Sequence, residues 1–123
     1  MQPAAELRLP AETAYVAVLR MTTAGIAARL DFTLDAIEDL RIAVGEACAL
    51  VLEGADPSGD LRATYQLADD QLTVEIAADT IGPLEPDRDS FAWQVLTALC
   101  TRLDAESSDA HHAVSLTVPR VAD

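Results

Sequence analysis

The segment Thr33–Gly54, TLDAIEDLRIAVGEACALVLEG, constrains the fold of this 123-residue chain more than any other. Its apolar residues recur at intervals of three and four, which is the spacing of one buried face of an α-helix. They are Ile37, Leu40, Val44, Ala47, Cys48 and Val51. Thr33 is suited to cap the N-terminus, and Gly54 to end the helix in a left-handed conformation. From Ile42 onward nearly every residue is apolar, so we expect the second half to be almost wholly covered, with Glu46 as the single acid before Glu53 at its end.

The charge balance limits the possible partners. Eight Lys and Arg residues stand against 21 Asp and Glu, which gives a net charge of -13. The resulting negative potential repels nucleic acid and anionic membranes, so we expect neither as a direct partner and consider a basic protein a better one. No run reaches the roughly 18 to 20 apolar residues of a membrane span, and no secretion signal opens the chain. We expect a cytoplasmic protein in which Cys48 and Cys100 are core residues.

The hydrophobic periodicity predicts, in chain order, a strand, two helices, a hairpin, a loop, a third helix and a last strand. The first strand covers Glu6–Leu9, the first helix runs from Glu12 to about Arg29, and the second helix is Thr33–Gly54. The hairpin strands are Leu61–Leu67 and Leu72–Ala78, joined by a turn at Asp69-Asp70, and the loop Asp79–Asp89 follows. The third helix is capped by Ser90 or Asp89 and has the apolar stripe Phe91, Val95, Leu99 and Leu103; a polar break, Asp104–Ala110, then leads to the strand Val114–Val118, which Pro119 ends. The hairpin is apolar on one face only, so its other face meets water. We therefore predict a single α+β domain over residues 1–123, a two-layer sandwich with a mixed, mostly antiparallel sheet and about three helices on one face.

Four segments resemble the bacterial anti-sigma factor serine kinase family: LRLPAE, AYVAVLRMTTAGIAARL, LDAIEDLRIAVGEACALVLEGA and SFAWQVLTALC. The run IEDLRIAVGEAC is the most specific, and the last segment is similar to actinobacterial members. The resemblance implies the histidine kinase/HSP90-like ATPase fold. It also implies a small regulator of stress-response transcription that binds an alternative sigma factor and is commonly a dimer. An anti-anti-sigma factor releases the sigma factor, and active kinases phosphorylate that factor on serine or threonine with ATP and magnesium.

The central helix departs from the family at one position. Members carry an acid that activates water or the acceptor hydroxyl, followed four residues later by an asparagine that helps to hold magnesium. Here the acid is Glu46, and Leu50 takes the place of the asparagine. The spacing puts both on one side of the helix. A leucine offers no oxygen to magnesium, so no metal ligand is expected at this position.

The nucleotide motifs after the hairpin are also incomplete. In the family, an aspartate at a strand end accepts the adenine amino group and closely spaced glycines follow it. Asp79 matches the aspartate, but only Gly82 remains of the glycines, and Pro83 follows it. There is no second glycine before Phe91. The acids of this lid segment, which would repel a triphosphate, are Glu85, Asp87 and Asp89.

Arg20 resembles a basic position that family members use at the surface shared by sigma and anti-anti-sigma factors. Each candidate also has a structural explanation. Glu46 can be a solvated surface acid, and Asp79 can be an ordinary turn residue. Arg20 can be an arginine whose aliphatic part lies over the face of its helix. His111 and His112 have no acid or cysteine at metal-ligand spacing, so no metal site is expected there.

Together these observations predict an anti-sigma factor with a degenerate kinase fold that acts mainly by stoichiometric sequestration. One alternative is an active anti-anti-sigma serine kinase, with Glu46 as base and Asp79 and Gly82 at the adenine. Another is an interaction module that binds only an anti-anti-sigma-like protein. Cofactors are absent in the first hypothesis, whereas ATP and magnesium are required in the kinase hypothesis.

Overall fold

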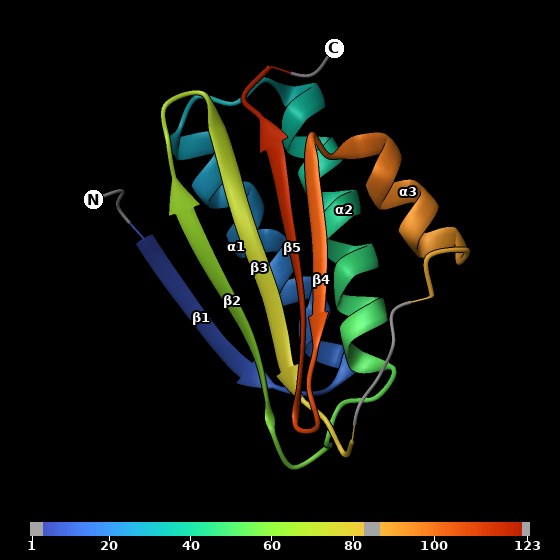
Figure 1. The fold of residues 1–123 in the computed structure, drawn as a ribbon. Helices are drawn as coiled ribbons and strands as arrows, with labels where there is room; N and C mark the ends of the chain where they lie inside the picture. The colour runs from blue at the N-terminus through green and yellow to red at the C-terminus, as the bar shows by residue number, and fades with distance from the viewer. Residues whose placement is uncertain (1–3, 83–86, 122–123) are drawn as a thin grey trace.

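The computed structural model describes residues 4–82 and 87–121, which form a sheet covered on one face by helices (Figure 1). The elements are β1 (Ala4–Pro10), a 3₁₀ turn η1 (Thr13–Tyr15), α1 (Val16–Arg29), α2 (Leu34–Leu52), β2 (Asp60–Leu67), β3 (Gln71–Asp79), α3 (Phe91–Leu99), β4 (Arg102–Ser107) and β5 (His111–Pro119). The five strands lie in the order β1-β2-β3-β5-β4. The predicted α+β two-layer fold is confirmed, and every pairing among the described strands is antiparallel.

The central helix α2 forms where its periodicity predicts. Thr33 caps it, because its hydroxyl accepts a hydrogen bond from the Ala36 amide at 3.2 Å. The fully buried side chains of α2 include Leu40, Val44, Cys48 and Val51, which pack against β3, β5 and α3. Apolar burial of this kind is the main source of helix stability in a folded domain.

Two expectations for α2 are wrong. Ile42 remains 43% exposed and Ala49 is exposed, because α1 covers only part of the outward side of α2. Gly54 does not adopt a left-handed conformation, because Gly82 is the single described glycine with positive φ. The helix instead ends at Leu52, its C-cap Glu53 is in a right-handed conformation, and the Ala55 amide then donates to the Leu52 carbonyl.

The first helix contacts the sheet through a polar pair inside the core. Leu19, Thr23 and Ala27 are its fully buried residues. The Thr23 hydroxyl lies 2.7 Å from the Tyr65 hydroxyl of β2, and Thr23 also donates to the Leu19 carbonyl. A buried tyrosine hydroxyl needs such a partner, so this pair fixes α1 over the first two strands.

The C-terminal part differs from the prediction. The third helix ends at Leu99 rather than Leu103, and the expected polar break contains strand β4. The inward face of β4 holds Leu103, Ala105 and Ser107, and two apolar residues are too weak a signal for its alternation to be recognised. Phe91 is 77% exposed, whereas Trp93 and Leu96 are the buried residues of α3. The capping prediction is confirmed, because the Trp93 amide donates to the Ser90 hydroxyl at 3.1 Å.

Candidate functional site

Glu46 lies half-buried on α2 beside a hollow that Arg20 of α1 also lines. The hollow has a volume of about 260 Å³, and its other lining residues are Glu38, Arg41, Ile42 and Gly45. The structure therefore brings together Glu46 and Arg20, which the sequence assigned to separate roles. A carboxylate and a guanidinium at one opening form a surface of mixed charge.

A second hollow adjoins the first along the crossing of α1 and α2. It has a volume of about 530 Å³ and shares Arg20 and Gly45 with the first. Its remaining lining residues are mostly apolar: Thr13, Val16, Ala17, Ala49, Leu52 and Glu53. We call the two hollows together the α1–α2 groove. Ala49 and Ile42 stay exposed because they border this groove, a role that their apolar character could not signal.

Gly45 determines where the Arg20 side chain lies. A Cβ atom at position 45 would lie 3.3 Å from Cδ of Arg20. The missing side chain therefore lets Arg20 lie directly against the backbone of α2, with Nη1 3.6 Å from the same point, although the residue as a whole is exposed. Sequence reasoning missed this function of Gly45, whose only local signal is a glycine inside a strongly helical pattern.

Leu50 is part of the hydrophobic core. Its side chain is 3% exposed and belongs to the buried cluster that joins the helices to the sheet. Although it follows Glu46 by one helical turn, it does not line the groove described above. The position at which the family resemblance implies a magnesium ligand is therefore filled by hydrocarbon.

Asp79 lies on the opposite side of the sheet from Glu46. Its carboxylate pairs with Arg62 of β2 at 3.3 Å, on the face that points away from the helices. Arg62 also lies 3.4 Å from Nδ1 of His111. The residue at this strand end that faces the helices is Ala78, which is fully buried. The structure does not bring Asp79 together with Glu46.

Gly82 ends the described part of the segment after β3. Its φ of 124° lies in the range that favours glycine, so another residue at this position would be strained. Ile81 before it is 78% exposed. Pro83 and Glu85 lie outside the described residues, and Asp87 and Asp89 are exposed at the approach to α3.

Sequence reasoning missed a polar position beneath the end of α2. His112 is 1% exposed, and neither of its ring nitrogens has a hydrogen-bond partner. The hydroxyl of Thr80 is likewise buried without a partner. Thr80 continues the β3–β5 ladder, because its amide donates to the Ala110 carbonyl at 3.0 Å, and strand alternation places it on the same face as His112.

Burial lowers the pKa of His112, the carboxylate of Glu53 opposes this shift, and His111 adds to it. His112 is therefore neutral at pH 7. The signal was present in the sequence, since His112 keeps the alternation of Val114, Leu116 and Val118. Because successive strand residues point to opposite faces, His111 and His112 cannot share a metal ion.

The side chains around this position do not fit the magnesium-bound nucleotide of an active kinase. Leu50 and Ala78 offer no oxygen to a metal ion or to an adenine amino group. Within residues 4–82 and 87–121, no group of three or more His, Cys, Asp and Glu residues is placed to hold a metal ion. The unpartnered atoms of His112 and Thr80 are the polar groups that remain available there.

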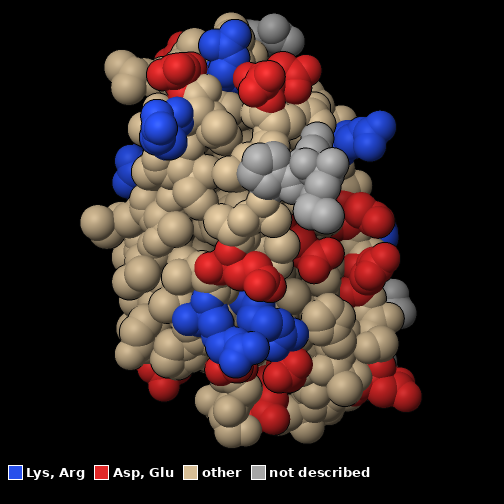
Figure 2. Space-filling view, turned by 90° about the vertical axis from the view of Figure 1, so that its left-hand side faces the viewer, with Lys and Arg blue, Asp and Glu red and all other residues tan. Residues whose placement is uncertain are grey.

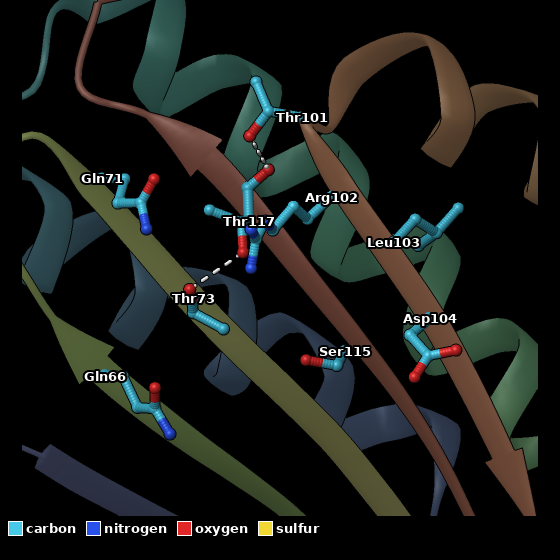
Figure 3. Close-up of a pocket in the computed structure, with 9 residues that line it drawn as sticks. All are labelled: Gln66, Gln71, Thr73, Thr101, Arg102, Leu103, Asp104, Ser115 and Thr117. Atoms are coloured by element: carbon cyan, nitrogen blue, oxygen red, sulfur yellow. Dashed lines mark hydrogen bonds between the residues drawn. The ribbon is translucent and has the colours of Figure 1, made fainter.

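A wider polar groove lies on the open face of the sheet (Figure 3), with a volume of about 640 Å³. Its centre is a hydrogen bond of 2.9 Å between the hydroxyls of Thr73 and Thr117, and Thr101 donates to the Thr117 carbonyl. Gln66, Gln71, Arg102 and Asp104 point outward around these hydroxyls. The hydroxyls satisfy one another, so we explain this groove as a solvated sheet face.

Comparison with known proteins agrees with the fold. Residues 9–90 match the family model of the histidine kinase-like ATPase domain. The chain is similar to serine-protein kinase RsbW of Bacillus cereus (strain Q1), with 38% identity over 74 residues, which is 58% of this chain and 46% of that protein. The same-named protein of Bacillus subtilis (strain 168) is 39% identical over 75 residues, 58% of this chain and 47% of that protein. The match thus spans about half the length of these relatives.

No helix in the described part of the chain is both long and apolar enough to cross a membrane.

Proposed function

Because the chain belongs to the histidine kinase-like ATPase domain family, we propose that it is an anti-sigma factor that binds and sequesters an alternative sigma factor. In this proposal it represses stress-response transcription stoichiometrically, with lost or weakened kinase activity. An anti-anti-sigma factor competes for the same surface and releases the sigma factor. The protein works in the cytoplasm as a homodimer, without direct contact to nucleic acid or membrane.

The observation that carries this proposal is the burial of Leu50. A side chain that is 3% exposed and packed in the core cannot be displaced by a magnesium ion without loss of stability. The helices still offer a surface on which a protein partner can bind. A leucine at this position gives no ligand to the magnesium ion that phosphoryl transfer requires.

The α1–α2 groove is the proposed contact surface for the protein partners. It presents apolar Val16, Ala17 and Ala49 next to the exposed charge of Arg20. An arginine beside an apolar hollow is the combination that dominates many protein interfaces. The net charge of -13 also favours encounter with a basic segment of a partner.

The test is retention of candidate alternative sigma factors on the purified, folded chain. We expect one of them to be retained in a one-to-one complex, with association that slows as salt rises. Arg20→Ala should weaken retention, and Arg29→Ala serves as the matched control because Arg29 lies on the same helix but outside the groove. If the folded chain retains no sigma factor, the proposal fails, and an interaction module that binds only an anti-anti-sigma-like protein remains.

A second candidate function is an active serine/threonine kinase that phosphorylates the anti-anti-sigma factor. Two observations favour it: Glu46 is only partly buried, and His112 and Thr80 keep buried polar atoms without a hydrogen-bond partner. Incubation with ATP, magnesium and the anti-anti-sigma factor tests it. Phosphoserine that forms with the wild type and disappears with Glu46→Ala would support the kinase over pure sequestration.

A further inference from the structure

Strand β4 is one edge of the sheet, and β5 is its only neighbour among the described strands. The turn that joins the two strands sets the backbone directions of β4, because the Ser108 amide donates to the His111 carbonyl at 2.8 Å. Hydrogen-bonded and non-hydrogen-bonded pairs alternate along an antiparallel ladder, so the backbone groups of Leu103 and Ala105 point away from β5. Within the described residues no hydrogen bond occupies these outward N–H and C=O groups. This side of β4 is therefore open to a further strand.

The exposed face of β4 becomes acidic along the strand. Asp104 and Glu106 alternate with the inward-facing residues, and together with Glu75 of β3 they line a hollow of about 160 Å³. Ala113 and Ser115 of β5, which have short side chains, are the other lining residues. None of the three carboxylates forms an ion pair within residues 4–82 and 87–121. A lysine or arginine side chain that reached this hollow would be attracted by all three.

The two edges of the sheet differ in charge. Figure 2 looks onto the side of the molecule where β1 lies, and acidic and basic side chains are close together there. On β1 itself, Glu6 and Arg8 share the exposed face. On β4, Arg102 begins the exposed face and only acids follow it, at Asp104 and Glu106. A basic segment is therefore attracted to the β4 edge more than to the β1 edge.

The helix-facing side of the β4 edge is uncharged. Figure 1 shows α3 beyond β4, on the side away from β5, and α3 contacts both α2 and β4. The sequence of α3, FAWQVLTAL, contains no charged residue. Leu103 and Ala105 face the same layer and are only half-buried. A strand added beside β4 would thus meet uncharged neighbours on its helix-facing side, which suits apolar side chains.

We propose that the β4 edge binds an extended segment of the protein partner as an added antiparallel strand, and that this segment carries basic residues at alternate positions. In strand addition, main-chain hydrogen bonds supply affinity and alternate side chains supply specificity. The facing positions define the order of side chains, since opposite charges directly across two strands are favourable. Aligned with β4 from Glu106 back to Arg102, the bound segment has a basic, an apolar, a basic, an apolar and an acidic residue.

This inference rests on the proposed function only in requiring a protein partner, and it names the chemistry of one segment of that partner. A labelled peptide with the core Lys-Val-Lys-Val-Glu tests it on the full chain. We expect fluorescence polarisation to show saturable binding that weakens as salt rises. The charge-reversed core Glu-Val-Glu-Val-Lys should bind roughly tenfold more weakly or worse.

A change in the peptide backbone separates strand addition from simple charge attraction. N-methylation of both valines keeps every charge but removes the N–H groups that would face Leu103 and Ala105, so binding should fall roughly tenfold or more. N-methylation of both lysines is the matched control, because their N–H groups would point away from β4, and it should change binding little. If the peptide with N-methylated valines binds as well as the unmodified one, the proposal is overturned.

A charge change on the protein tests the location. Asp104→Lys should weaken binding of the Lys-Val-Lys-Val-Glu peptide roughly tenfold and improve binding of the charge-reversed peptide. Glu12→Lys makes the same charge change at an exposed residue outside β4 and should leave the preference between the two peptides intact. Equal effects of the two variants would overturn the proposal. Self-association of the chain that Asp104→Lys abolishes would assign the edge to a second copy and would also overturn it.

The outcomes distinguish this inference from the proposed function. If the folded chain binds the Lys-Val-Lys-Val-Glu peptide as described but retains no sigma factor, the proposed function fails and the β4 assignment stands. If it retains a sigma factor but does not bind the peptide, the β4 assignment fails and the proposed function stands.

Discussion

The α1–α2 groove and the end of strand β3 lie on different sides of α2, and they differ in what fills them. The groove is open and combines apolar side chains with Arg20 and Glu46. At the strand end, Leu50 and Ala78 are buried, and Asp79 faces the other side of the sheet. One side of α2 thus borders an open groove of mixed apolar and charged character, whereas Leu50 on its other side offers no oxygen to a magnesium ion.

The comparison teaches that the two sides of one helix can be assigned separate roles, which in the proposed function are a partner-binding side and a side without a nucleotide site. Residues that face the groove and residues that face the sheet alternate along α2. Leu50 contributes to the apolar core on the side of α2 that faces the sheet, and it does not line the groove. The following substitutions probe the two sides separately.

Leu50→Asn should have the largest effect on stability. It buries an amide without partners in the core and removes apolar contacts, so we expect a loss of about 3 kcal/mol in the free energy of unfolding. Urea titration measures this loss. Leu34→Asn is the control, since Leu34 lies on the same helix but is 84% exposed, and its change should be close to zero. Equal losses in the two variants would contradict the assignment of Leu50 to the core.

Arg20→Glu should have the largest effect on partner binding. Reversal of an exposed charge at the centre of the groove should cost about 2 kcal/mol or more of sigma-factor affinity, while unfolding changes little. Titration calorimetry with the retained sigma factor gives the affinity. Arg29→Glu makes the same charge change outside the groove; if both variants bind equally well, the groove is not the contact surface.

The pH dependence of stability should report on His112. Because burial lowers its pKa in the folded state, the unfolded chain binds the proton first. Its contribution is fully present above the unfolded pKa of about 6.5 and is lost as the pH falls through the lower folded value. We expect the free energy of unfolding to fall between pH 7.5 and 5.5, and His112→Leu to flatten this slope. A slope that His112→Leu leaves unchanged would place its origin elsewhere.

Asp79→Ala should have the smallest effect. The Arg62–Asp79 pair is partly exposed, with half of the Asp79 side chain accessible, so its removal should cost less than about 1 kcal/mol. Thermal unfolding of the variant measures this change. A loss of several kcal/mol would mean that Asp79 supports the fold in a way that its exposed ion pair does not explain.

Much of the fold was predictable because it depends on local patterns. The Thr33 cap, the hairpin turn at Asp69-Asp70 and the last strand all follow from residue types at fixed spacing. Strand β4 escaped prediction because two apolar inward residues are too weak a pattern, and only pairing with β5 defines it. Hydrogen bonding between strands distant in sequence is not encoded in any short window.

The site was less predictable, because side-chain direction decides it. Asp79 and Ala78 are neighbours in sequence, yet they face opposite sides of the sheet. The apolar alternation that ends at Ala78 already placed that residue on the helix side, whereas the family motif pointed to Asp79. The contact between Gly45 and Arg20 likewise depends on how two helices cross. The proposed roles of Glu46, Gly82 and Arg20 remain predictions.

Calorimetric titration of the folded chain with ATP and magnesium, repeated with ADP, tests the central claim most directly. The burial of Leu50 and Ala78 predicts no heat of binding up to millimolar nucleotide. The same preparation must retain the sigma factor, which shows that it is active. Binding at low micromolar nucleotide would contradict the account and would mean that the kinase site survives in another form.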